Sequence, residues 1–360
     1  MEHEAAPSAQ VVLMDGTFAS LTEGRGSSIA RIHALLSGEM GALPGRVQLH
    51  YAPGQQWAAW RTLPELISGA TLDHNIRAGY AWLARNWRPG VPLFLFGYSR
   101  GGVGVCALAE MIARVGLLRP EHASDQAMNC AWNIYRYRGG RLDPELCHDH
   151  VPIRMIGLMD RVMSLGIRLP FLWTFSAPDF DYARSRLAPN VERGAHALAL
   201  DETRSAFAPI LWEPGGEHDP RVQQLWFRGC HADVGGQLGG HEQARPLANL
   251  PLVWLIAQAQ ELGLPLPPDW RQHHPCDGTA PALGSWHSWG KIFLMRAPRQ
   301  VGAHGSEALH ASVAQPYPGP ARLHGQLSGA KPPRRRLRSK LRLKLRLRPD
   351  DNSRDNSAPA

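Results

Sequence analysis

The sequence lacks three features that mark membrane-spanning or secreted proteins. No stretch approaches about eighteen uninterrupted apolar residues, which argues against a helix that spans a membrane. The N-terminal residues MEHEAAPSAQ contain neither a basic n-region nor an apolar core, so we expect no secretory signal peptide. The five cysteines are scattered and none lies in a C-x-x-C pair, which argues against a disulfide framework and favours a reducing compartment.

Metal-binding patterns are also scarce. The segment Cys147-His148-Asp149-His150 contains potential ligands, but it lacks a distant second pair of ligands at the spacing of a zinc site. We interpret it as a polar loop, and we expect no metal and no other cofactor.

The excess of positive charge lies in one segment. The formal net charge is +8, yet residues 1–330 contain 28 basic and 28 acidic residues. Residues 331–348 hold ten of the 39 Lys and Arg residues and no acidic residue. This distribution argues against nucleic acid as a partner of the main domain.

The basic segment also has a periodic pattern. Over residues 341–348 Leu alternates with Arg or Lys, which places the leucines on one side of an extended strand. Such a segment suits an anionic membrane surface, to which each nearby cation contributes about 1 kcal/mol. Binding of nucleic acid or another polyanion is an alternative, and so is a solvated tail with no specific role.

Apolar runs and helical spacing alternate along the rest of the chain. Continuous apolar runs predict buried strands, and apolar positions that recur at three and four residues predict helices. Their alternation favours an α/β fold, a mainly parallel sheet with helices on both faces. We expect a disordered lead-in over 1–9, one folded domain over 10–320 and a basic, disordered tail over 321–360. The predicted strands are 11–14, 47–51, 92–96, 153–159 and 225–227, and the predicted helices are 25–36, 63–87 with a break near Gly69, 103–118, 202–207 and 250–262.

The segment Gly97-Tyr98-Ser99-Arg100-Gly101 has the G-x-S-x-G pattern and lies between a predicted buried strand and a predicted helix. A serine on such a tight turn projects its hydroxyl above the carboxyl edge of the sheet. We therefore predict that Ser99 is a nucleophile and that the backbone N–H of Arg100 forms half of an oxyanion hole. A glycine-rich turn that binds phosphate or only packs tightly is the alternative.

A serine nucleophile needs a base and an acid that orients the base. His231 follows the predicted strand 225–227, and Asp160 follows the predicted strand 153–159. In folds that carry such a serine turn, the three residues follow along the chain in the order Ser, acid, His. Ser99, Asp160 and His231 satisfy this order. Asp233 is a competing carboxylate. A hydrogen-bonded loop histidine and a helix-capping aspartate are the structural alternatives.

Two further segments bear on the same site. Asp15-Gly16-Thr17 ends the first predicted strand, so a backbone N–H of Gly16 or Thr17 can supply the second oxyanion donor while Asp15 stabilises the loop. A plain Asp-Gly turn explains the same residues. Residues 165–175, LGIRLPFLWTF, are rich in large apolar groups and predict a lid or acyl-chain pocket, or ordinary core packing.

Together these segments resemble the α/β-hydrolase domain of type VI secretion phospholipase effectors. The resemblance is carried, in chain order, by VVLMDGT, LFLFGYSRGG, IGLMDRVMSLG, HALALDETRSAFAPILW and WFRGCHADVGG, with a short LHASV near Leu309. It implies a Ser99–Asp160–His231 triad that cleaves fatty-acyl esters of glycerophospholipids. It also implies a bacterial cytoplasmic source, export by a type VI machine without a signal peptide, and secretion-machine and immunity proteins as partners.

Three segments depart from the family pattern. The family's continuation of the nucleophile motif is replaced by Gly102-Val103-Gly104-Val105-Cys106. Met159 and Arg161 replace the Trp and Thr that flank the acid, and Gln237-Leu238 replaces Gly-Tyr. These departures leave the triad intact and affect substrate identity. A thioesterase, amidase or small-ester esterase, and a non-catalytic binding protein on the same scaffold, are the alternative functions.

Overall fold

The computed structural model describes residues 7–56, 70–163, 185–212, 219–287, 290–291, 293–314 and 316–323. The predicted lid over 165–175 and the basic segment 331–348 lie outside these residues, as does the first part of the predicted helix 63–87.

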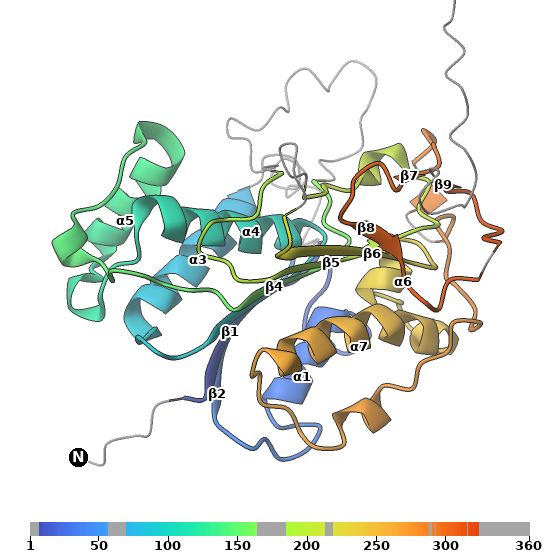
Figure 1. Ribbon diagram of the computed structural model, residues 1–360, viewed down its shortest axis with the longest axis horizontal. Coiled ribbons are helices and arrows are strands. Elements are labelled where there is room, and N and C mark those ends of the chain that lie inside the picture. Colours follow the sequence, from blue (N-terminus) through green and yellow to red (C-terminus); the bar gives the residue numbers. More distant parts are fainter. Residues whose placement is uncertain are drawn as a thin grey trace, which may run out of the picture.

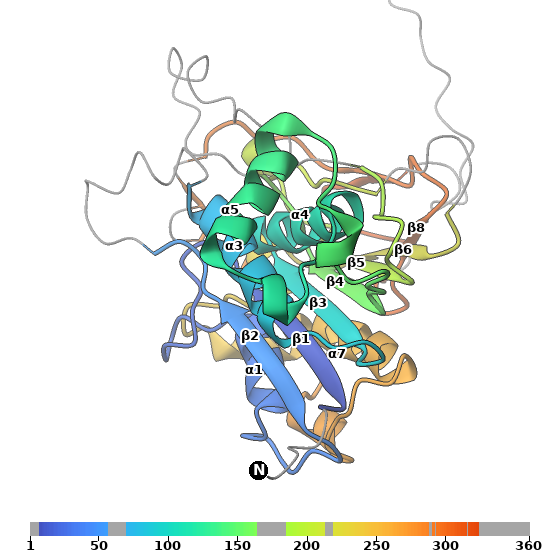
Figure 2. The ribbon, with the colours of Figure 1, turned by 90° about the vertical axis from the view of Figure 1, so that its left-hand side faces the viewer.

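A seven-stranded sheet forms the centre of the molecule (Figure 1). The strand order is β2-β1-β3-β4-β5-β6-β8, and every neighbouring pair is parallel. Figure 2 shows the strand directions turning steadily across the sheet, the twist expected of L-amino acids. The strands are β1 (Ala9–Met14), β2 (Val47–Ala52), β3 (Leu93–Tyr98), β4 (Met155–Met159), β5 (Gly194–Ala199), β6 (Val222–Phe227) and β8 (Glu307–Leu309), and a separate two-stranded sheet pairs β7 (Gln300–Val301) with β9 (Arg322–Leu323).

Helices cover both faces of the sheet (Figure 1). α3 and α4 pack on one face with α5 outside them, and α1 and α7 pack on the other. Every residue of the inner strands β1, β3, β4 and β5 is buried, because both of their faces are covered. The prediction of a parallel, helix-covered sheet is confirmed. The helices are α1 (Ser28–Leu36), α3 (Ala70–Asn86), α4 (Arg100–Val115), α5 (Asp125–Asn133), α6 (His231–Gly235) and α7 (Arg245–Glu261).

Some sequence-based boundaries were wrong. The helix expected over 202–207 is a single 3-10 turn, Ser205–Phe207, and α7 begins at Arg245 rather than Leu250. Two elements were not predicted from the sequence: β5, whose residues GAHALA have mostly small side chains, and α5. His231 begins the short helix α6 and is not a loop residue.

The topology gathers polar side chains at one edge of the sheet. Asp15 follows β1, Ser99 follows β3, Asp160 follows β4 and His231 lies shortly after β6. Because the strands are parallel, their carboxyl ends meet at the same edge, where the loops of such folds form sites.

Candidate active site

Ser99 lies on a strained turn between β3 and α4. Its backbone has φ 56° and ψ −124°, a conformation that costs free energy in a residue with a side chain. The turn is closely packed: a Cβ added at Gly101 would lie 2.1 Å from the carbonyl oxygen of Met14, and one at Gly97 would lie 2.6 Å from the Cα atom of Gly102. The strained backbone and the flanking glycines are the features expected of a serine held at the top of the sheet.

Ser99, His231 and Asp160 lie in one line of hydrogen bonds. The Nε2 atom of His231 is 3.0 Å from the Oγ atom of Ser99, and its Nδ1 atom is 2.6 Å from the Oδ2 atom of Asp160. All three side chains are buried or nearly so. In the tautomer that this geometry favours, Nδ1 donates to the carboxylate and Nε2 accepts from the hydroxyl, which is the arrangement a general base requires.

Asp160 also has a strained backbone, with φ 44°. Among the described residues other than glycine, only Asp160, Ser99 and Phe18 have a positive φ. Its Oδ1 atom accepts a hydrogen bond from the backbone N–H of Ala199 at 3.0 Å, so β5 helps to orient the carboxylate. The strained backbones of Ser99 and Asp160 indicate that the surrounding structure holds both residues in place.

Arg299 also contacts Asp160, although no pattern in the sequence predicted it at the site. Its Nη1 and Nη2 atoms donate to the two carboxylate oxygens of Asp160 at 2.5 Å and 3.0 Å, and they also donate to the carbonyl oxygens of Ala199 and Phe207. Burial by itself raises the pKa of Asp160, but the Arg299 cation and the hydrogen bond to His231 outweigh burial and hold that pKa well below its usual range. Asp160 is therefore an ionised acceptor for the imidazole.

The ring of His231 is packed between two aromatic rings. The centroid of Tyr98 lies 4.8 Å away and that of Phe207 lies 4.9 Å away, and the backbone N–H of His231 donates to Oε2 of Glu202. Burial lowers the pKa of His231, with the hydrogen bond and charge of Asp160 opposing the effect. The imidazole is thus kept neutral near pH 7, as a base must be.

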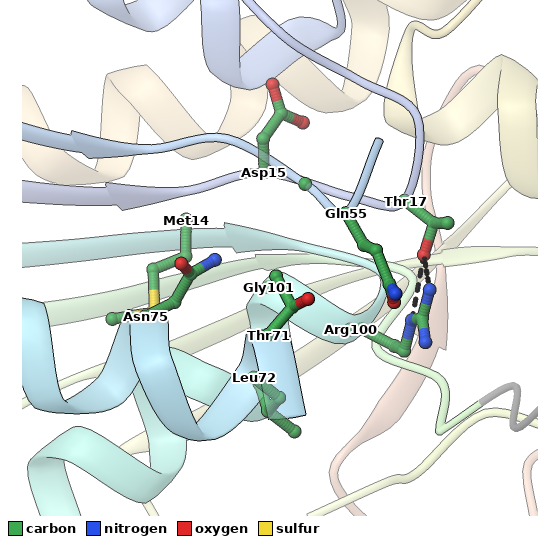
Figure 3. Close-up of a pocket in the computed structure, with 10 residues that line it drawn as sticks. Met14, Asp15, Thr17, Gln55, Thr71, Leu72, Asn75, Arg100 and Gly101 are labelled. Atoms are coloured by element: carbon green, nitrogen blue, oxygen red, sulfur yellow. Dashed lines mark hydrogen bonds between the residues drawn. The ribbon is translucent and has the colours of Figure 1, made fainter. Parts of the chain in front are cut away.

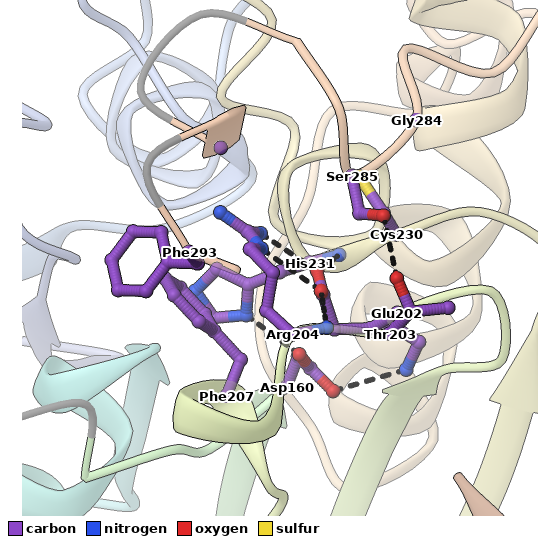
Figure 4. A network of polar contacts seen from close by, with 12 residues as sticks. Asp160, Glu202, Thr203, Arg204, Phe207, Cys230, His231, Gly284, Ser285 and Phe293 are labelled. Carbon is purple, nitrogen blue, oxygen red and sulfur yellow. Dashed lines mark hydrogen bonds and ion pairs between the residues drawn. The ribbon is translucent and has the colours of Figure 1, made fainter. Parts of the chain in front are cut away.

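Charged groups from the loop after β5 complete this environment (Figure 4). Arg204 forms a two-point ion pair with Glu202, and its guanidinium carbon lies 3.7 Å from the centroid of the Phe207 ring. The ring of Phe293 packs edge-on against that of Phe207, with 5.2 Å between the centroids.

The carboxylate of Asp233 does not face His231. It accepts from the backbone N–H groups of Cys230 at 2.8 Å and of Leu283 at 2.6 Å, so it caps the start of α6 and holds the loop that follows residue 280. Its partners are therefore structural ones.

The turn after β1 lies against Ser99. A Cβ at Gly16 would lie 2.5 Å from the ring of Tyr98 and 3.1 Å from the Cβ of Ser99. The N–H of Gly16 donates to Oδ1 of Asp15, which also accepts from Ser27, while Oδ2 accepts from Tyr51. Burial raises the pKa of Asp15 to about 6 in spite of these bonds.

A small cavity opens beside this turn (Figure 3). Arg100 lines the cavity, with its Nε atom 2.8 Å from the Oγ1 atom of Thr17, and the other lining residues include Gln55, Leu72 and Asn75. Arg100 and Thr17 therefore connect the nucleophile turn to the turn after β1 by side chains as well as by backbone packing.

In the parts of the chain that the structure describes, no three His, Cys, Asp or Glu side chains are grouped to hold a metal ion. Cys147 forms an isolated bridge with Leu118, and His148 packs edge-on against Trp87. No described helix is long and apolar enough to cross a bilayer.

A model of the family described as "T6SS, Phospholipase effector Tle1-like, catalytic domain" matches residues 9–258. The chain belongs to this family. The match confirms the resemblance found in the sequence, and the fold is the α/β-hydrolase fold that was predicted from it.

Several proteins are similar to this member of the Tle1-like family. An uncharacterised protein from Saccharomyces cerevisiae is 30% identical over 160 residues, which is 40% of this chain and 22% of that protein. An uncharacterised Pseudomonas aeruginosa structure is 17% identical, with a TM-score of 0.48, over 73% of this chain and 47% of the other. A structure of the Tle1 effector bound to the VgrG spike of the type VI secretion system is 15% identical, with a TM-score of 0.39, over 65% and 52%. The chain thus spans about half the length of these two solved structures and less of the yeast protein.

Proposed function

We propose that the chain is a serine hydrolase that cleaves fatty-acyl esters of glycerophospholipids, with Ser99 as nucleophile, His231 as base and Asp160 as the orienting acid. The observation that carries the proposal is the unbroken line from the Oγ atom of Ser99 through His231 to Asp160, with contacts of 3.0 Å and 2.6 Å. Membership of a family of phospholipase effector catalytic domains supports the substrate class.

The reaction proceeds in two steps of acyl transfer. His231 takes the proton of Ser99 as Oγ attacks the ester carbonyl, and it returns that proton to the departing alcohol when the ester bond breaks. Water then attacks the acyl-enzyme with His231 again as base, which releases the fatty acid and restores Ser99. Asp160 stabilises the imidazolium in both steps and stays ionised throughout.

The oxyanion is held by backbone donors at the two turns that meet at Ser99. Arg100 supplies the first through its position at the start of α4, where the helix dipole also favours negative charge. We assign the second to Thr17 rather than Gly16, because the N–H of Gly16 is directed at the carboxylate of Asp15. Asp15 then has the role of holding this turn in place.

The family suggests export by a type VI secretion machine, with a spike protein of that machine and an immunity protein as partners. A Tle1 effector has been solved in complex with a VgrG spike, which supports the first of these partners. The basic segment 331–348 is proposed to add attraction to anionic membranes.

A fluorophosphonate probe tests the chemistry, followed by measurement of fatty acid released from phospholipid vesicles. We expect wild type to react with the probe and to release fatty acid, and Ser99→Ala to do neither. Ser37→Ala is the matched control, because Ser37 is exposed at the end of α1 and its hydroxyl donates only locally, to Ala34 and Glu39.

The other outcomes separate the alternatives. Probe labelling without lipid turnover retains a serine hydrolase with another acyl substrate, such as a thioester or a small ester. Absence of labelling in folded wild-type protein contradicts the proposal and favours a binding role for the scaffold.

A further inference from the structure

One anchored loop carries most of the exposed large apolar side chains in the described part of the chain. Trp286, Leu294 and Met295 are 59%, 80% and 68% exposed. The other described side chains of this kind, Leu21 and Tyr137, belong to other segments of the chain. Single exposed apolar residues are ordinary, but three within ten positions of one loop indicate an interaction surface. Trp286, Leu294 and Met295 are called the apolar loop surface below.

Backbone hydrogen bonds hold this loop in place. The N–H of Ser205 donates to the carbonyl oxygen of Met295 at 3.0 Å, and the N–H of Ala297 donates to that of Thr203 at 2.8 Å. The loop is therefore joined to the segment after β5 on both sides of Arg296. Such ordering keeps Leu294 and Met295 exposed in a defined position, instead of letting them fold back onto the protein.

The Arg296 side chain fixes the other half of the surface. It donates to the hydroxyl groups of Thr203 and Ser285 at 3.0 Å and 2.9 Å, and its guanidinium carbon lies 3.6 Å from the centroid of the Trp286 ring. A tryptophan held against a cation at the surface has the amphipathic character found where proteins meet lipid headgroups.

The surface leads to the candidate base. Phe293, next to Leu294, packs against Phe207 at 5.2 Å, and Phe207 packs against His231 at 4.9 Å (Figure 4). A lipid layer on the loop would thus lie two aromatic rings from the imidazole that the reaction uses.

The charges around the surface suit phospholipid headgroups. Residues 278–306 contain no Asp or Glu, while Lys291 is exposed and Arg296 is partly exposed beside Trp286. Cations at the rim of an apolar surface attract the phosphate groups of a bilayer. A protein partner would instead need an apolar patch of its own to cover this surface.

We propose that the apolar loop surface inserts into a glycerophospholipid bilayer and positions the catalytic edge of the sheet on the membrane, an inference that rests on the proposed function. Insertion is led by Leu294 and Met295, with Trp286 at the headgroup level. The proposal is distinct from the basic segment 331–348, because it depends on apolar contact and not on net charge.

Co-sedimentation with phosphatidylcholine vesicles tests this, using the full chain in about 1 M salt, where the Debye length is about 3 Å and the basic segment contributes little. All variants carry Ser99→Ala, so the vesicles stay intact. We expect Leu294→Asp with Met295→Asp to reduce vesicle binding by at least about tenfold, since two inserted apolar groups become charges. Tyr137→Asp is the matched control, because it places a charge at a side chain that is 70% exposed and belongs to a different element; it is expected to bind as the parent does.

In a second set of proteins Ser99 is left unchanged. There the double variant is expected to keep wild-type fluorophosphonate labelling and wild-type turnover of a soluble short-chain ester, while its release of fatty acid from vesicles falls. Equal vesicle binding by parent and double variant overturns the inference. So does a parent that is a dimer in solution and becomes a monomer in the double variant, because a second copy is then the occupant. Because the binding arm needs no turnover, a failure of the proposed hydrolase activity is seen separately in the labelling arm.

Discussion

Arg299 contacts both oxygens of Asp160, and through them it acts on His231, the proposed base, which it does not touch. In Arg299→Met we expect the pKa of Asp160 to rise, because the Arg299 cation no longer opposes the effect of burial. We also expect a loss of stability of about 3–5 kcal/mol, typical of a buried ion pair that loses one partner. Activity should fall most at low pH, where Asp160 takes up a proton, so the acid limb of the pH–rate profile moves to higher pH.

The measurement is the pH dependence of kcat/KM on a soluble ester, with Arg299→Lys as the conservative variant. Lysine restores the charge without the two-point contact, so we expect it to return the acid limb toward that of wild type with a lower kcat. A reduced rate with an unchanged pH profile in Arg299→Met would contradict a positioning role and leave only a structural one.

Residues of the site differ in how far the sequence could predict them. Ser99, Asp160 and His231 each follow a strand with an apolar pattern, so reasoning from strand ends placed them at one edge. Arg299 lies 139 positions beyond Asp160 in a segment with no apolar periodicity, and only the tertiary structure brings it there. Asp233 was a plausible acid by its position in sequence, but a helix cap uses its carboxylate.

At the scale of elements, the approach of α4 to β1 determines where the nucleophile turn lies. We expect Gly101→Ala to destabilise the protein by about 2 kcal/mol or more and to lower activity, since its Cβ would lie 2.1 Å from the Met14 backbone and neither element can move alone. Gly305→Ala is the control, because a Cβ there meets nothing within 4 Å; it should change the free energy of unfolding by less than about 0.5 kcal/mol. Urea unfolding followed by circular dichroism measures both, and equal stability of the two variants would refute the packing argument.

Elements with strong apolar patterns were predictable, and those with small or few residues were not. β3 is a continuous run of large apolar side chains, whereas β5 is GAHALA and hides a buried histidine among small residues. α6 has five residues, too few for any helical period to be seen, so His231 was expected in a loop. The order of strands in the sheet depends on long-range packing and could not be derived from local pattern.

At the scale of the whole molecule, buried titratable groups determine how stability depends on pH. Burial lowers the pKa of His196 in β5 to about 3, and its Nε2 atom accepts from the backbone N–H of Arg161. An unfolded histidine titrates near pH 6.5, so below that pH the unfolded chain binds more protons and stability falls as pH drops toward 3. Asp160 acts in the same direction below about pH 4, where its unfolded form takes up a proton.

Asp15 opposes this trend over a narrower range. Its folded pKa of about 6 lies above the unfolded value, so the cost of its buried charge is present above pH 6 and is relieved as pH falls toward 4. We expect the free energy of unfolding to be lower at pH 5 than at pH 7, with about 2 kcal/mol of the loss due to His196. His196→Gln should lessen the fall by that amount, whereas a change of the exposed His150 to Gln should not. Urea titrations at the two pH values measure this, and equal falls in all three proteins would exclude His196 as the cause.

The contact between Arg299 and Asp160 also limits where the chain can be cut. The family match ends at residue 258, yet Arg299, which contacts Asp160, lies 41 residues further on, and the sheet's last strand, β8, follows it. A fragment cut at the end of the matched segment would keep Ser99, Asp160 and His231 and still leave a buried carboxylate without its cation. We therefore expect the smallest unit that folds with an ionised Asp160 to be longer than the segment that the family model matches. In a library of fragments, activity is expected only in those that extend past residue 309.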